Sequence, residues 1–253
     1  MFHSVTINGK NTWDDYHMVP VNGLLIPPAP DKKITTIDLK TGNGVLDVST
    51  LLTGFPLYQN RVSEFEFYIL EPWEIPDYDQ NYTPPSTAKS SYEIYSDILN
   101  DLHGTVGTMT LEDDPGWEYY GQFSITSYET EGNPRRVVSL WYELNPYKVN
   151  PTPSTVTVNG IGASAWNIVT LTVSDLDNMP LTPTITVTGE FNAETVEIKV
   201  IKPPYSNPTE ISKTVGAAGT YTWPDISVYK EAKFCFKGDT TKSTTWTYNK
   251  GRL

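Results

Sequence analysis

The chain is predicted to fold as a mainly β protein with two domains, and three features of its sequence support this class. Charged residues make up only 19% of the 253 residues, while Thr, Pro, Tyr and Trp are abundant, a mixture that favours strands and turns. Most of the chain alternates apolar and polar residues in short runs, and one segment alone has a convincing helical period. The composition changes at residues 145–153, where three prolines occur in nine residues. We therefore expect domains at residues 1–148 and 149–253.

The first domain begins with three strand patterns. Residues 5–9 alternate and then turn, which is typical of a strand that starts a hairpin. Residues 34–39 also alternate, and the Thr41-Gly-Asn-Gly44 sequence after them is a strong turn signal. Residues 61–70 are the clearest strand pattern, because glutamates alternate with apolar residues as on a strand with one solvent-exposed face. The candidates for the core face of this strand are Val62, Phe65, Phe67 and Ile69.

Residues 71–89 predict a long loop, because they contain four prolines and no periodicity. Long ordered loops are usually functional, and an arm that embraces a neighbouring subunit would suit this one.

Residues 91–102 predict the helix. Ser90 or Ser91 can cap it, Glu93 stands in its first turn, and Gly104 ends it. The expected apolar face of this helix consists of Tyr92, Tyr95, Ile98, Leu99 and Leu102.

Three consecutive antiparallel strands are expected after the helix, at residues 106–111, 119–127 and 136–144. The acidic Pro-Gly turn at 112–116 and the turn at 131–134 separate them. Beyond residue 149, seven further alternating runs follow one another without a helical pattern, which is typical of a small β-sandwich. These runs are residues 155–158, 168–173, 184–188, 196–201, 219–223, 232–237 and 244–248.

The negative charge of the chain is confined to the first domain. Residues 1–149 hold 9 Lys and Arg against 21 Asp and Glu, a net charge of −12, whereas residues 150–253 hold 9 against 9. A surface this negative repels DNA and anionic membranes, so nucleic-acid recognition by contact is not expected. A solvated acidic face would account for any single acid. A channel that passes DNA without binding it would account for their concentration in one domain.

The sequence predicts no catalytic, metal-binding or cofactor-binding residues. His3, His17 and His103 are scattered and have no zinc-like spacing, and Cys235 alternates as in a half-buried strand. Aspartates in turns, such as the Asp113-Asp114 pair, are expected to bond their own backbone rather than calcium. No signal peptide is expected within residues 1–20, and no apolar run is long enough to span a bilayer. We therefore expect a protein that does not insert into membranes and that is soluble in the cytoplasm in which it is made.

Two alternatives remain open. Glu64, Glu66, Glu118 and Glu143 could form the paired carboxylates of a glycoside hydrolase, although no motif supports this. Trp166, Trp223 and Trp246 could stack on sugar rings in a carbohydrate-binding module for cell-surface glycans, although core positions are ordinary for Trp in a sandwich. The absence of a signal peptide argues against a secreted module of this kind.

Six short stretches in order along the first 148 residues resemble the distal tail protein of siphophages that infect Gram-positive bacteria. The second half resembles that family only in its pattern. The stretches that carry the resemblance are Val5-Thr-Ile-Asn-Gly-Lys-Asn-Thr12, Gly44-Val-Leu-Asp-Val-Ser49, Tyr58-Gln-Asn-Arg61, Leu99-Asn-Asp-Leu-His-Gly104, Tyr119-Tyr-Gly-Gln-Phe123 and Asn145-Pro-Tyr-Lys148.

The resemblance implies a structural hub of the phage tail tip with no enzymatic activity. It implies a tail-tube-like β-sandwich or split barrel for the first domain and a galectin-like or carbohydrate-module-like sandwich for the second. The implied assembly is a hexameric ring, single or stacked, in the virion. Its implied partners are the major tail tube protein, a tail-associated lysin or tail-fibre protein, and in some phages receptor-binding proteins. DNA would pass through the ring centre without specific binding.

Overall fold

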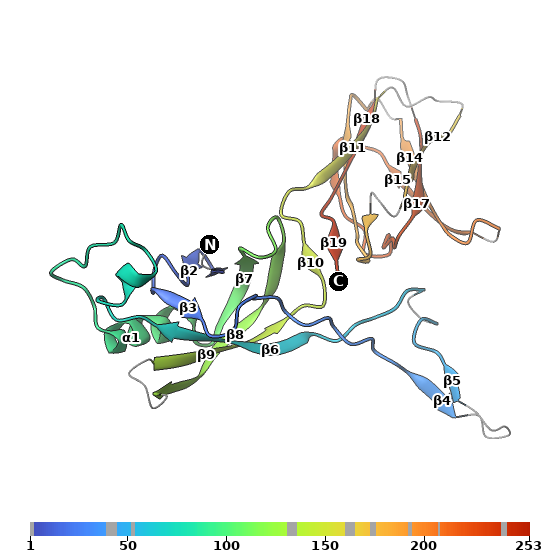
Figure 1. Ribbon diagram of the computed structural model, residues 1–253. Helices are drawn as coiled ribbons and strands as arrows, with labels where there is room; N and C mark the ends of the chain where they lie inside the picture. Colours follow the sequence, from blue (N-terminus) through green and yellow to red (C-terminus); the bar gives the residue numbers. More distant parts are fainter. Residues whose placement is uncertain are drawn as a thin grey trace. The chain divides into compact units, whose positions relative to one another are not determined.

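A computed structural model gives the structure of the protein (Figure 1), and it describes residues 3–38, 45–51, 54–130, 136–159, 165–172, 176–191, 194–206, 208–238 and 242–253. The chain divides into two compact units, Met1–Lys148 and Val149–Leu253. Strands dominate both units, which confirms the mainly β class. No helix in the described ranges is long and apolar enough to cross a bilayer.

One large sheet organises the first unit. Its strands lie in the order β2-β1-β7-β8-β9-β6-β3, and the path stays open from β2 to β3. The strands are β1 Val5–Ile7, β2 Lys10–Asn11, β3 Met18–Pro20, β6 Arg61–Ile69, β7 Thr105–Leu111, β8 Glu118–Thr130 and β9 Arg136–Leu144. The predicted hairpin start at residues 5–9 and the three strands after the helix are thereby confirmed. The turns predicted at 41–44 and 131–134 lie outside the described residues.

The core of the first unit lies on one face of this sheet. On β6, Phe65, Phe67 and Ile69 point into the core, as the alternation predicted. Val62 does not, because its even position places it on the other face, where 54% of it is exposed.

Helix α1, Ser91–Leu102, covers the core face of the sheet (Figure 1). The predicted cap is confirmed: the Ser90 side chain and Glu93 form a reciprocal capping box. Gly104, with a φ of 73°, follows the last turn. The predicted apolar face was partly wrong, because the fully buried positions are Ile94, Ile98 and Leu102. Tyr92 is 64% exposed, and Tyr95 and Leu99 pack only at the margin of the core.

The connection between β3 and β6 carries a separate hairpin of β4, Thr36–Asp38, and β5, Val45–Asp47. The segment at residues 71–89, which was predicted to be a long loop, lies between β6 and α1, and part of it packs against its own unit. Its short 3-10 helix, Ile75–Asp77, buries Ile75 against Val19 and Leu70.

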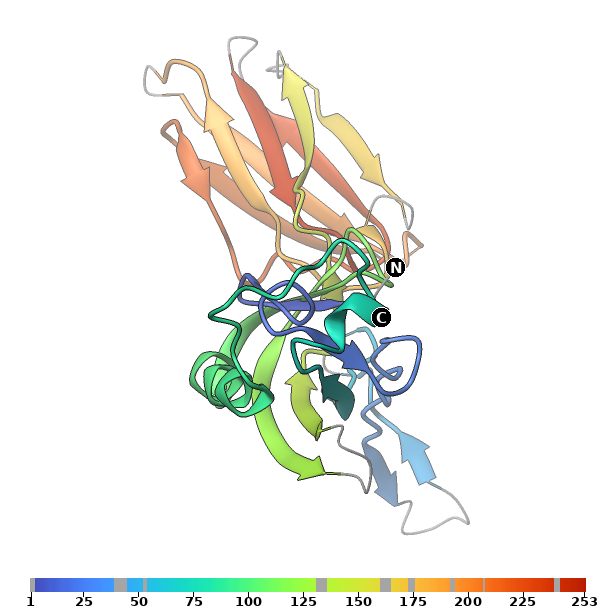
Figure 2. The ribbon, with the colours of Figure 1, turned by 60° about the vertical axis from the view of Figure 1, so that its left-hand side comes forward.

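The second unit contains two four-stranded sheets, β11-β18-β13-β16 and β12-β17-β14-β15. Figure 2 shows the ribbons of these sheets, whose inner faces share one core. In that core, Phe234 of one sheet stacks on Trp246 of the other at a centroid distance of 3.9 Å. The sequence pattern did not predict β15, because apolar and polar residues alternate only weakly in it. The strands are β11 Ser154–Asn159, β12 Asn167–Leu171, β13 Thr184–Thr188, β14 Val196–Lys202, β15 Thr209–Val215, β16 Gly219–Tyr221, β17 Ala232–Lys237 and β18 Ser243–Tyr248. The remaining strands of the chain are two short ones, β10 Lys148–Val149 and β19 Gly251–Arg252.

The buried face predicted for helix α1 and the buried face observed lead to different expectations for the stability of two variants. Ile98→Ala should lower the free energy of unfolding by about 2–5 kcal/mol, because it removes buried methyl groups and leaves a cavity. Tyr92→Ala should change it by less than about 0.5 kcal/mol, because this side chain is exposed. Urea denaturation of both variants checks this, and a larger loss for Tyr92→Ala than for Ile98→Ala would contradict the buried face described above.

Candidate functional site

The face of the large sheet opposite the core is acidic. It carries one glutamate or more on each of three neighbouring strands, and we call these five side chains the acidic face: Glu64 and Glu66 on β6, Glu118 and Glu129 on β8, and Glu143 on β9. Strand pairing shows that they share a face, because directly opposite residues point to the same side. Glu66 lies opposite Ser139 of β9, and Ser139 lies opposite Ser127 of β8, so Glu64 and Glu129, each two residues away, are on that side too. Glu143 lies opposite Gln122 of β8, and Glu118, four residues before Gln122, shares its side. The four glutamates singled out from the sequence are all here, whereas Glu129 was missed.

A β-bulge in β8 brings Glu129 to the acidic face. Ile125 is opposite Leu140 and Ser127 is opposite Ser139, so Thr126 is an extra residue. The bulge reverses the alternation beyond it. Tyr128 then stacks on Tyr95 of α1, with ring centroids 4.1 Å apart, while Glu129 turns outward. Unbroken alternation would have predicted the reverse.

Within the described strands of the sheet, no lysine or arginine shares this face. The two arginines of β6 and β9 lie on the core side, where Arg61 is 5% exposed and Arg136 donates to the Tyr128 hydroxyl at 2.8 Å. The partners of Glu143 are neutral: it accepts hydrogen bonds from Asn60 at 2.8 Å and from Gln122 at 2.9 Å. The five carboxylates therefore create a negative field without an ion partner on the same strands.

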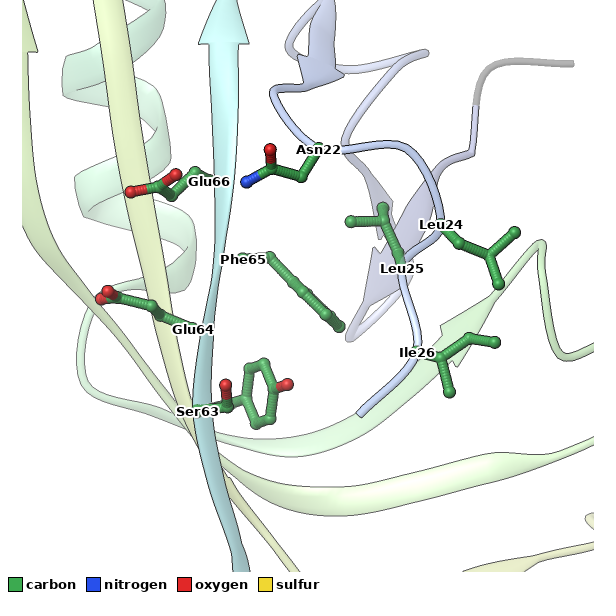
Figure 3. Close-up of a pocket in the computed structure, with 9 residues that line it drawn as sticks. Asn22, Leu24, Leu25, Ile26, Ser63, Glu64, Phe65 and Glu66 are labelled. Carbon is green, nitrogen blue, oxygen red and sulfur yellow. The ribbon is translucent and has the colours of Figure 1, made fainter. Parts of the chain in front are cut away.

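Two hollows adjoin the acidic face. The first, of about 320 Å³, is lined by Glu64, Glu66 and Glu129 among polar neighbours. The second, of about 390 Å³, lies between the β6 edge and residues 22–26 (Figure 3). Glu118 and Glu143 line neither hollow, so Glu64 and Glu66 are the acids that the two hollows share. Since they are two residues apart on one strand, they lie side by side on one wall instead of facing each other across a cleft as glycoside hydrolysis requires.

The core side of β6 holds a buried guanidinium that fixes two distant segments. Arg61 donates to the Pro28 carbonyl at 2.8 Å and to the Pro146 carbonyl at 2.9 and 3.0 Å. Its guanidinium carbon lies 5.7 Å from the centre of the Tyr119 ring. Burial lowers the pKa of Arg61 from its usual value. The side chain thus ties the start of the connection to β4 and the end of the first unit to the sheet.

Asp113 and Asp114 do not bond their own turn through their side chains, contrary to the prediction. Asp113 pairs with His3 at 2.6 Å and accepts from the Leu25 amide at 3.0 Å. Asp114 accepts from the Tyr119 hydroxyl at 2.6 Å and from Lys148 at 2.8 Å. Burial acts to raise the pKa of Asp114, but the hydrogen bonds from Lys148 and Tyr119 outweigh it and hold the pKa below its usual range.

The three histidines and the cysteine are apart from one another. His17 packs between Trp13 and Tyr82, and burial lowers its pKa. His103 accepts from the Ile125 amide at 3.1 Å and so joins the end of α1 to β8. Cys235 is buried, and burial raises the pKa of its thiol. In the part of the chain that the structure describes, no group of three His, Cys, Asp or Glu could hold a metal ion.

The three candidate tryptophans of the second unit have different surroundings. Trp246 is 1% exposed in the core, so it cannot present a face to a sugar. Trp223 is partly buried and stacks on Tyr221 with ring centroids 5.4 Å apart. Trp166 has the Lys199 ammonium 5.0 Å from its ring. The sugar-binding alternative therefore rests on the last two residues.

The fold can be compared with those of known proteins. No family model and no curated protein matches this chain. It is similar to the crystal structure of SPP1 Dit (gp 19.1), described as a paradigm of the hub adsorption apparatus in Gram-positive infecting phages. The TM-score is 0.59 over 100% of both chains, at 12% sequence identity. At this identity the likeness is one of fold, and it confirms the resemblance in fold to the distal tail protein that the sequence predicted.

The Asp114 interactions predict how stability depends on pH. Asp114→Asn should lower the free energy of unfolding by about 2 kcal/mol at neutral pH, because Lys148 loses its charged partner. A folded-state pKa below the unfolded value stabilises the fold above the unfolded pKa of about 3.9, and this contribution is lost as the pH falls through the folded pKa. Urea unfolding should therefore show a constant difference between variant and wild type from pH 7 to about pH 5 and a smaller one below about pH 4.

The exposed Asp14→Asn is the matched control for this measurement, and its stability should stay close to wild type. A difference between Asp114→Asn and wild type that persisted unchanged to about pH 3 would contradict the role of the Asp114 carboxylate.

Proposed function

We propose that this chain is a structural hub protein of a phage tail tip and has no enzymatic activity. Six copies form a ring, single or stacked, that connects the tail tube to a tail-fibre or tail-associated lysin protein, and the DNA leaves through its centre. Residues 1–148 build the ring, and residues 149–253 provide a sandwich for contacts with other tail proteins, such as receptor-binding proteins. The fold likeness to SPP1 Dit, itself described as a hub, supports this role and a place in the virion.

The observation that carries the proposal is the acidic face, which we assign to the wall of the channel. Duplex DNA carries one negative charge per about 1.7 Å of its axis and binds proteins chiefly through lysine and arginine contacts to phosphate. Five glutamates, with no lysine or arginine on the same described face, offer the phosphates no partner. A wall of this kind repels DNA weakly along its whole length, which suits a molecule that must slide past.

An open sheet is also suited to building such a wall. The sheet of the first unit ends in edges at β2 and β3 and does not close on itself. Strand edges can join neighbouring copies, and head-to-tail contacts that close give a ring.

The first test is the assembly state of the purified chain. Light scattering should give a mass of six subunits or twice six, and negative-stain images of the same sample should show a ring with an open centre. A chain that stays monomeric at every concentration tested would count against the ring.

The second test concerns the channel wall. A triple variant Glu64→Lys, Glu66→Lys and Glu129→Lys should still form rings but should retain short linear duplex DNA at low salt at least about 10-fold more tightly than wild type. The matched control, Glu190→Lys with Glu197→Lys and Glu231→Lys, makes the same change in net charge within the second unit. Electrophoretic mobility shift at two salt concentrations measures the difference. Equal DNA retention by the two triple variants would show that net charge and not the acidic face matters.

A further inference from the structure

Half of strand β6 has an unpaired edge. β3 pairs only with Phe67–Ile69, and the Val21 amide then donates to the Glu66 carbonyl at 2.9 Å. Since the Leu70 amide donates to the His17 carbonyl on the same side, the even-numbered residues of β6 direct their backbone groups toward this edge. Among the described residues, none makes a backbone hydrogen bond to Val62 or Glu64 on this side.

A hollow runs along this unpaired edge. Residues 22–26 turn away from β6 and leave the space of about 390 Å³, with Leu25 and Phe65 on its walls (Figure 3). Leu24 and Ile26 at its margin are 64% and 51% exposed. Figure 3 shows the carboxylates of Glu64 and Glu66 on the side of β6 away from Leu25, although both residues border the hollow. An edge of this kind is a template for one more strand.

The same chain carries a strand, β4, that is paired on one edge only among the described residues. The β4–β5 hairpin is a sheet of two strands, which alone is marginally stable in water. Its apolar side chains are uncovered, with exposed fractions of 68% for Ile34, 52% for Ile37 and 51% for Leu46. The Val48 amide donates to the Thr35 carbonyl, so Thr36 directs its backbone groups to the outer edge of β4, away from β5.

We propose that β4 of one copy adds as a strand to the unpaired edge of β6 in the next copy. This inference rests on the ring of the proposed function and names the contact that builds it. New backbone hydrogen bonds would satisfy Val62 and Glu64, and Ile37 would cover the apolar margin of the hollow.

The geometry of the contact is head-to-tail. Each copy offers one donor strand and one acceptor edge at different places on its surface, so the contact is heterologous, and such contacts close into rings or continue as fibres. A second copy is the occupant that the chain itself supplies, because both the uncovered strand and the uncovered edge belong to the same sequence.

Two variants interrupt the two halves of the contact. Val62→Pro removes an edge N–H without removing a hydrogen bond to β9, and proline is tolerated on edge strands. Its matched control is Val62→Thr, which keeps the N–H. Ile37→Asp places a charge on the donor strand, and its control is Ile168→Asp in the second unit, where the isoleucine is 59% exposed. Thermal unfolding establishes that each variant is folded.

Light scattering should find rings for the wild type and both controls, and monomers for Val62→Pro and Ile37→Asp. An equimolar mixture of these two variants should give heterodimers and nothing larger, because the intact β4 of one can join the intact β6 of the other only once. Rings formed by either variant alone, or a mixture without heterodimers, would overturn the contact while leaving the ring standing. A wild-type chain that forms no ring would overturn the proposed ring and this contact together.

Discussion

The buried guanidinium of Arg61 is the constraint on which the first unit depends. A charged group that is 5% exposed needs polar partners, and the carbonyls of Pro28 and Pro146 accept three hydrogen bonds from it, one from each guanidinium nitrogen. Proline carbonyls are suitable acceptors because neither belongs to a strand ladder. Through these bonds the connection that leads to β4 and the Asn145-Pro-Tyr-Lys148 segment are held to the same point of β6. Lys148 is fixed beside them by Asp114, which also holds Tyr119.

Because Arg61 holds its neighbours on the core side, the other side of β6 is free to serve a second purpose. One sheet thus has a core face that packs against α1 and an outer face that is acidic. Strand alternation separates the two faces, since neighbouring residues point in opposite directions. The bulge at Thr126 preserves this separation where the sequence of β8 would otherwise have put Glu129 in the core and Tyr128 in water. Five of the 21 acids of residues 1–149 are therefore gathered on one face of the sheet.

The same sheet also has open edges. A protein that remained a monomer would be expected to cover the part of the β6 edge that β3 does not pair with, and also the apolar residues of the β4–β5 hairpin. Here the two uncovered features are complementary in kind, one offering backbone groups beside an apolar margin and the other a strand with exposed isoleucines. The acidic face and the unpaired edge meet on β6, so a strand added along the edge would extend the sheet that carries the acidic face.

The sequence by itself determined what depends on neighbours along the chain. Alternation identified β6 and most strands of both units, the Ser90–Glu93 pair identified the start of α1, and the count of acids located the charge in residues 1–148. Only the tertiary structure decided what depends on distant residues. Whether Ile94 or Tyr92 faces the core depends on the angle at which α1 meets the sheet. The partners of Asp113, Asp114 and Arg61 are remote in sequence, and a bulge is defined by the partner strand. These features follow from packing and pairing between segments, which local patterns of residues do not encode.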